Sequence, residues 1–210
     1  MKSKSVTAVI AMLLIAAFLP VHTETPGTIL VWKVIVPPLK AANVRTCPLC
    51  GASLPNARVE RDGNLVMKRL LREELKTLKE CKFHFLAKVP GASENGKKDR
   101  VEKMIAVAKQ KGAGGLLVPV LLRYRELVGN KYAASSPASV AFHLHLIRVE
   151  DSKAVWDFAY VETQRPLSEN LLDAKKFWKR RFKWVKVERL LIEGIEKAMR
   201  DFPKCEGEAP

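Results

Sequence analysis

The stretch CPLCG (residues 47–51) combines reactive residue types with a spacing that suits chemistry. Two residues separate Cys47 from Cys50 and Gly51 follows them, so both sulfurs can lie on one tight turn. Such a pair can bind a metal, exchange disulfides, or form a structural disulfide. A tetrahedral zinc site needs two further ligands, and Cys81 with His84 is the pair that the sequence offers for them.

A structural disulfide is the interpretation that we favour for these cysteines. A redox-active Cys-x-x-Cys usually begins a helix, whereas Pro55 and Asn56 follow here and indicate a loop. The chain has 4 cysteines, and Cys81 and Cys205 are the other two, so several pairings are open. We therefore predict disulfide bonding at Cys47 and Cys50, and we assign no metal site and no cofactor.

Two histidines in the stretch VAFHLHLIRVE (140–150) are a second candidate site. His143 and His145 lie on one face of a predicted strand, because side chains alternate between the faces of a sheet. Two imidazoles at this spacing can bind a metal or respond to pH. The other face, with Val140, Phe142 and Leu144, is predicted to be the core. We interpret the histidines as structural residues on the opposite face.

Motifs of common enzyme classes are absent from the sequence. Ser135, Ser136 and Ser139 lie outside any Gly-x-Ser-x-Gly turn. The chain has neither a phosphate-binding loop nor a dinucleotide fingerprint, and GAGG (112–115) leads into a strand instead of a helix. The sequence therefore predicts a protein that is not an enzyme.

The elements that would position these residues follow from hydrophobic periodicity. Strands are predicted at 29–36, 81–89 and 114–127, with helices at 65–79 and 97–112 between them, which implies parallel pairing. Pro119 suggests an edge, a bulge or a break in the third strand. The segments 140–150 and 154–163 alternate and predict an antiparallel hairpin. Two helices, at about 170–182 and 187–201, are expected to complete the fold.

This order predicts the α/β class, as a single domain with a mixed sheet. It combines a parallel strand–helix–strand–helix–strand part, an antiparallel hairpin and C-terminal helices. The domain is expected to span 28–203, and 204–210 is expected to be a flexible tail.

The amino terminus indicates export. Lys2 and Lys4 precede an apolar run from Val6 to Leu19, and the chain becomes polar after Pro20. This layout is typical of a secretory signal peptide, here 1–23, with an uncleaved N-terminal anchor as the alternative. The net charge of +15 attracts anionic partners. For an exported chain these are anionic lipid or cell-wall polymer in the periplasm or cell envelope, and nucleic acid is not expected.

The chain from 112 to 172 resembles a known group of envelope proteins. Its strand leads into Arg-Tyr-Arg at 123–125, a later strand opens with AVW at 154–156, and ETQRPLSENLL follows at 162–172. The pattern is similar to proteins related to LpoB, CsgG and the amino-terminal domain of TolB. The resemblance implies a non-enzymatic protein that docks on other envelope proteins. Many members are lipoproteins, whereas this chain has no acylation cysteine near the amino terminus.

The stretch KKFWKRRFKWVK (175–186) concentrates basic and aromatic residues. Its aromatic rings are expected to face mainly the core, while its cations form a solvated face. The alternative is a binding surface for an envelope protein, anionic lipid or polymer. The residues assigned to that surface are Lys176, Trp178, Lys179, Arg180, Arg181, Lys183 and Trp184.

Overall fold

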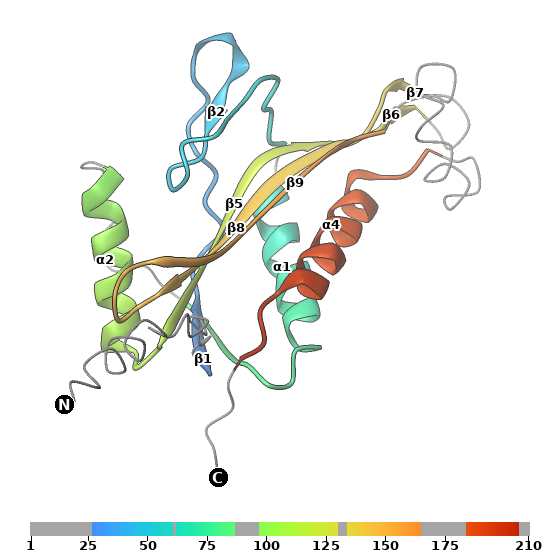
Figure 1. Cartoon of the computed structure of the whole chain (residues 1–210). Coiled ribbons are helices and arrows are strands. Elements are labelled where there is room, and N and C mark those ends of the chain that lie inside the picture. The colour runs from blue at the N-terminus through green and yellow to red at the C-terminus, as the bar shows by residue number, and fades with distance from the viewer. Residues whose placement is uncertain (1–26, 61, 87–96, 130–133, 165–183, 206–210) are drawn as a thin grey trace, which may run out of the picture.

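A five-stranded mixed sheet forms the centre of the molecule (Figure 1). The computed structural model describes residues 27–60, 62–86, 97–129, 134–164 and 184–205. The strand order is β4-β1-β5-β8-β9. The bounds of these strands are Thr28–Val31 for β1, Lys82–Phe85 for β4, Gly115–Arg125 for β5, Ser139–Arg148 for β8 and Ala154–Thr163 for β9.

The parallel half of the sheet has the predicted connectivity. β1 pairs in parallel with β4 on one side and with β5 on the other. Helix α1 (Gly63–Leu75) connects β1 to β4, and helix α2 (Lys97–Gln110) lies between β4 and β5. Parallel neighbours require such crossovers, so the alternation of strand and helix patterns in the sequence predicted this part of the fold correctly.

The antiparallel half is the predicted hairpin. β8 pairs with both β5 and β9, and its register places His145 opposite Asp157 and His143 opposite Ala159. The turn between β8 and β9 contains Ser152 at a φ of 61°. Beyond the end of β5, β6 (Val128–Gly129) and β7 (Ala134–Ser136) form a small two-stranded ribbon.

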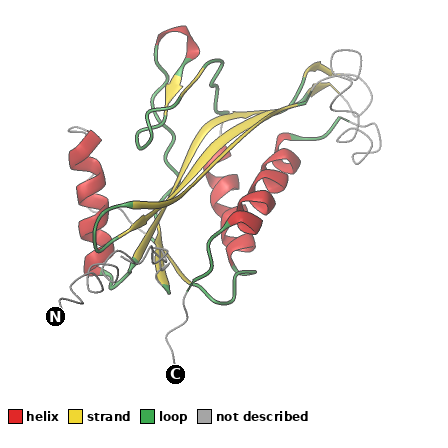
Figure 2. Cartoon of the chain, in the orientation of Figure 1, coloured by secondary structure: helices red, strands yellow, loops and turns green. Residues whose placement is uncertain are grey.

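Helices cover the two faces of the sheet unequally (Figure 2). α1 and α4 (Val187–Asp201) pack side by side on one face, over Phe142, Leu144 and Leu146. α2 covers part of the other face through Met104, Ile105 and Ala108. The segment that carries Cys47 and Cys50 packs on the same face through Cys47, Leu49 and Leu54.

Pro119 lies within the central strand β5 without breaking it. Its carbonyl accepts a hydrogen bond from the Ile35 N–H at 2.9 Å and so points away from β8. The nitrogen of a strand residue points to the same side as its carbonyl, and on that side β1 has already ended at Val31. The missing N–H therefore costs no ladder hydrogen bond on the β8 side. The irregularity in the β5–β8 pairing occurs later, between Leu121 and Arg123.

The carboxyl-terminal helix α4 has the predicted bounds. A disulfide from Cys81 to Cys205 then fixes the chain just beyond this helix, and Cys205 is buried. The predicted helix at 170–182 and the signal segment 1–23 lie outside the described residues. Within the described residues, no helix has the length and hydropathy needed to cross a membrane.

Candidate metal centre

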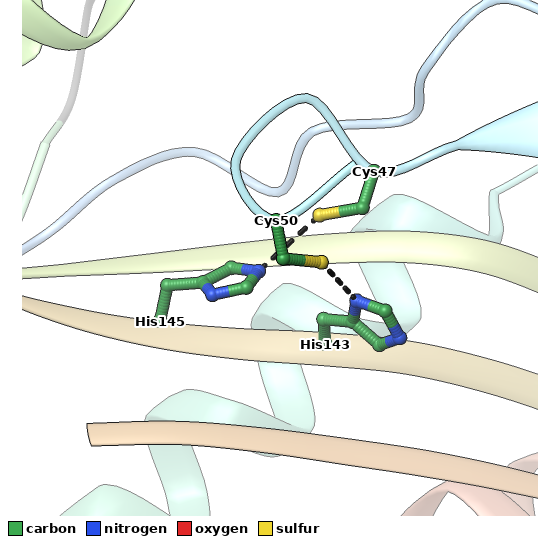
Figure 3. Close-up of side chains that lie close together, drawn as sticks. All are labelled: Cys47, Cys50, His143 and His145. Carbon is green, nitrogen blue, oxygen red and sulfur yellow. Dashed lines mark hydrogen bonds between the residues drawn. The ribbon is translucent and has the colours of Figure 1, made fainter. Parts of the chain in front are cut away.

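Two segments far apart in the sequence meet on the second face of the sheet (Figure 3). One is the loop between the short strands β2 (Arg45–Thr46) and β3 (Ser53–Leu54), which follow the 3-10 turn η1 (Ala41–Asn43). The other is the middle of β8. Cys47 and Cys50 come from the loop and His143 and His145 from the strand, and the four side chains converge.

The cysteines stand on a tight knuckle. The Gly51 N–H donates to the Cys47 carbonyl at 3.0 Å, and the Cys47 N–H donates to the Ala52 carbonyl at 2.8 Å. Gly51 has a φ of 80°, a left-handed conformation that suits glycine and turns the chain back toward β3. The glycine after the second cysteine therefore allows both sulfurs to face the sheet.

Contacts outside the four residues also hold the knuckle on the sheet. Leu49 and Leu54 pack against the core cluster of the second face. The Arg123 guanidinium donates to the Pro55 carbonyl at 2.9 Å, and Arg45 donates to the Ala57 carbonyl at 2.6 Å. The cysteine-bearing segment is therefore positioned by packing and hydrogen bonds on both sides of the site.

The alternation of β8 brings the histidines to this face. Phe142, Leu144 and Leu146 belong to the core on the α1–α4 side, so His143 and His145 point the other way. Both are buried, with exposed fractions of 7% and 3%. This confirms the prediction that they lie opposite the core face. The knuckle that carries Cys47 and Cys50 lies against them (Figure 3).

Two sulfur–nitrogen distances at the site are close to those of a tetrahedral zinc site. Cys47 Sγ lies 3.2 Å from His145 Nε2, and Cys50 Sγ lies 3.4 Å from His143 Nδ1. All four donor atoms lie within 4.8 Å of one another. In a tetrahedral zinc site, bonds of about 2.3 Å to sulfur and about 2.0 Å to nitrogen place sulfur and nitrogen about 3.5 Å apart. A small contraction of the longer separations would complete this geometry.

Burial sets the electrostatics of the metal-free site. It raises the pKa of the Cys47 thiol to about 11, while backbone N–H groups of Cys50 and Leu49 bond the sulfur and act in the opposite direction. Burial, and after it the neighbouring His145, lowers the pKa of His143. Amide donors aimed at the sulfur stabilise a thiolate, and a neutral imidazole is the form that binds metal.

A carboxylate binds one histidine on the ring nitrogen that faces away from the cysteines. His145 Nδ1 hydrogen-bonds Asp157 Oδ1 on β9, while its Nε2 faces Cys47. A ligating histidine usually donates its second ring N–H to such a carboxylate, which fixes the tautomer and raises the basicity of the ligand nitrogen. The donor set and its supporting carboxylate therefore fit a bound metal ion.

The structure corrects the sequence-based prediction for the cysteines. In this structure Cys47 and Cys50 are free thiols and each faces a histidine, so the predicted disulfide bond is not formed here. Cys81 is paired with Cys205 instead. The alternative ligand set with Cys81 and His84 fails as well, because Cys81 is in that disulfide and His84 is exposed on the edge strand β4.

The predicted basic and aromatic surface lies almost entirely outside the described residues. Lys176, Trp178, Lys179, Arg180, Arg181 and Lys183 fall in the range 165–183, which the structure does not describe. Trp184 is described and is half-buried just before α4. The role assigned to this surface stays a prediction.

Comparison with solved structures places the fold. The chain is similar in fold to PelC. The PelC dodecamer from Paraburkholderia phytofirmans matches with a TM-score of 0.50 at 11% identity, over 84% of this chain and 86% of the PelC chain. At this identity the likeness to PelC concerns the fold alone. No family model and no curated protein matches the sequence.

Weaker matches include two further bacterial proteins. Lipoprotein GNA1162 from Neisseria meningitidis matches with a TM-score of 0.44 at 12% identity, over 74% of this chain and 99% of that chain. The LpoB C-terminal domain from Salmonella enterica matches with a TM-score of 0.40 at 17% identity, over 68% of this chain and 87% of that chain. LpoB is one of the proteins to which the sequence was likened above, and the likeness to CsgG and TolB stays a prediction.

Proposed function

We propose that the chain is a zinc-binding protein in which Cys47, Cys50, His143 and His145 hold one Zn²⁺ ion. The observation that carries this proposal is the convergence of two sulfurs and two imidazole nitrogens, all within 4.8 Å of one another. Two sulfurs and two nitrogens in a tetrahedral arrangement are typical of zinc. Three of the four side chains are buried, as expected for ligands held in place by the fold.

The zinc would have a structural role. Four protein ligands complete a tetrahedron and leave no position for a substrate or an activated water, unlike a catalytic zinc site with three ligands. The ion would join the β2–β3 knuckle to β8, across 93 to 98 residues of chain. We therefore assign it the task of fixing the cysteine-bearing segment on the sheet, within a protein that is not an enzyme.

Metal analysis of the full-length chain tests this proposal. We expect one zinc per chain after purification without chelator, and a Co²⁺-substituted chain should show the absorption of tetrahedral cobalt with thiolate charge-transfer bands. The His143→Ala and Cys50→Ser variants should lose both signals. His84→Ala is the matched control, because His84 is exposed on an edge strand away from the site. A wild-type chain that binds zinc no better than Cys50→Ser would contradict the proposal.

The zinc-stabilised domain would act in the cell envelope through protein contacts. The signal-like segment 1–23 supports export, and the fold likeness to PelC, a dodecamer in its own structure, agrees with a role in assembly. Fractionation of cells, with the mature amino terminus determined by mass spectrometry, tests this assignment. Recovery of the chain in the cytoplasm with residues 1–23 attached would contradict it.

An alternative partner for an exported chain is an anionic surface. Seven of the twelve residues at 175–186 are Lys or Arg, which favours anionic lipid or cell-wall polymer. Sedimentation with anionic vesicles or cell-wall material, over a series of salt concentrations, separates this possibility from protein docking. Electrostatic binding must weaken as salt rises.

A further inference from the structure

The chain contains cysteines in two oxidation states. Cys81 and Cys205 form a disulfide, whereas Cys47 and Cys50 are thiols. A chain that has formed the first pair has met an oxidant that accepts electrons from thiols. The second pair must therefore be protected from that oxidant or react with it.

The two thiols of the knuckle differ in access. Cys50 is exposed, whereas Cys47 is buried with 1% of its surface accessible. Both stand on the turn closed by the hydrogen bond from Gly51 to Cys47, and their sulfurs lie within 4.8 Å of each other. An incoming disulfide can thus reach Cys50, and Cys47 is then placed to attack the Cys50 sulfur.

We propose that zinc and a Cys47–Cys50 disulfide are competing states of this site, and that the metal-free pair is a modification site for disulfide oxidants. The inference rests on the proposed zinc function. While zinc is bound, both sulfurs are engaged by the ion and the knuckle is held against β8. Without zinc, the same pair is a dithiol with an exposed Cys50 and a buried Cys47, in a chain that carries an oxidised pair elsewhere.

The reaction is a pair of thiol–disulfide exchanges. The Cys50 thiolate attacks an oxidant RS–SR, which gives a mixed disulfide at Cys50 and releases one RS⁻. The Cys47 thiolate then attacks the Cys50 sulfur, which closes the Cys47–Cys50 bond and releases the second RS⁻. The two cysteines lose two electrons and the oxidant gains them. The thiol protons go to solvent or to the released thiolates.

The disulfide state would lose the connection to the histidines. A sulfur in a disulfide is no longer a thiolate ligand, so His143 and His145 alone could not hold zinc in a closed tetrahedron. Oxidation would thus release zinc and remove the metal link between the knuckle and β8. In the zinc-loaded chain Cys47 and Cys50 would be linked through the ion to β8, whereas in the oxidised chain they would be linked only to each other. The Cys81–Cys205 disulfide is the same in both states.

Thiol counting with oxidised glutathione tests the competition. The full-length chain with Cys81–Cys205 intact is prepared zinc-loaded and after removal of zinc by chelator, and both forms are incubated with the oxidant. We expect the metal-free chain to lose both free thiols and to give a Cys47–Cys50 cross-linked peptide. The zinc-loaded chain should react at least an order of magnitude more slowly. Equal rates for the two forms, or a metal-free pair that stays reduced, would overturn the inference.

Single variants test the order of attack. In the metal-free Cys47→Ser chain we expect a stable mixed disulfide with glutathione at Cys50. In the metal-free Cys50→Ser chain we expect Cys47 to remain a thiol, because it is buried. If glutathione formed a mixed disulfide equally in the two variants, the assigned order of attack would be overturned.

The zinc content of the untreated chain is measured in parallel and reports on the proposed function alone. If the untreated chain contains no zinc, the proposed function is refuted. If zinc is bound but the thiols of the zinc-loaded chain react with oxidised glutathione as fast as those of the metal-free chain, only the competition is refuted.

Discussion

His145 and Asp157 lie opposite each other on β8 and β9, and the Nδ1–H of His145 donates to the Asp157 carboxylate while its Nε2 faces the Cys47 sulfur. The imidazole thus connects a carboxylate on the edge strand to the knuckle on the sheet face. The antiparallel register creates this relationship, because it pairs these two residues directly. A histidine held in this way has a fixed tautomer, with Nε2 available to a metal.

The Asp157→Asn substitution is expected to weaken zinc binding without removing it. The amide can still accept the hydrogen bond from Nδ1–H, but it lacks the negative charge that raises the basicity of the ligand nitrogen. Loss of such a supporting partner typically lowers metal affinity about tenfold to hundredfold. Competition with a chromogenic chelator measures the change. Asp151→Asn is the control, because that carboxylate pairs with Arg148 and Lys153 instead, and equal affinities for the two variants would refute this role of Asp157.

Removal of zinc is expected to loosen the cysteine-bearing segment and leave the sheet intact. Hydrogen exchange should accelerate at the Cys47 and Ala57 amides, which bond Ala52 and Asn43, while amides of the β5–β8 ladder stay protected. A ligand present at a hundred times its dissociation constant stabilises a fold by about 2.7 kcal/mol, so the melting temperature should fall with chelator. The His145→Ala chain should show no further fall. A chelator effect of equal size in that variant would contradict a role for the site.

The sequence predicted most of the sheet because its signals are local. The helix patterns between 31 and 115 and the alternation at 140–163 each specify one element and its neighbour. The candidate metal centre could not be assembled from the sequence, because its two halves are individually ambiguous. CPLCG lacked two ligands and the histidines lacked a cysteine nearby, and only the tertiary structure brings Cys47 to His145 across 98 residues. The sequence features that pointed to this cluster were the glycine after Cys50, which is typical of a metal-binding knuckle, and the placement of His143 and His145 on one face of a strand.

Loss of the Cys81–Cys205 disulfide is expected to destabilise the domain strongly. The bond spans a sequence separation of 124 residues, and constraining so long a loop lowers the entropy of the unfolded chain. Removing a native disulfide typically costs about 2–5 kcal/mol. Urea unfolding of the Cys81→Ser/Cys205→Ser double variant, compared with the oxidised wild type, measures this cost. An unchanged midpoint would mean that the bond contributes nothing to stability.

Tyr124 is expected to make stability fall in alkaline solution. Burial, and then the nearby carboxylates of Glu126, Glu188 and Glu60, raises the pKa of the Tyr124 phenol from 10.0 to about 12. The unfolded chain loses this proton near its ordinary pKa while the folded chain keeps it, so the contribution is fully present below that value and is lost as pH rises toward 12. Urea midpoints should therefore fall more steeply with pH in the wild type than in Tyr124→Phe. Parallel slopes would contradict the assignment.

Gly194 lies where helix α4 packs closely against the rings of Phe142 and Tyr160 on the sheet. A Cβ at this position would lie 2.7 Å from the Phe142 ring and would overlap the Tyr160 ring as well. Gly194→Ala is therefore expected to destabilise the domain, even though alanine favours a helix by up to about 1 kcal/mol over glycine. Overpacking in a well-packed core typically costs about 1–3 kcal/mol. Arg200→Ala, at an exposed position of the same helix, is the control.

The measurement for Gly194→Ala is the free energy of unfolding in urea, with zinc present at the same concentration for both variants. The Gly194→Ala midpoint should fall below that of the wild type, while Arg200→Ala should stay close to it. Circular dichroism should show unchanged helix content, because the cost arises from contact with Phe142 and Tyr160 and not from the helix itself. A Gly194→Ala chain as stable as the wild type would show that α4 can move away from the sheet without loss.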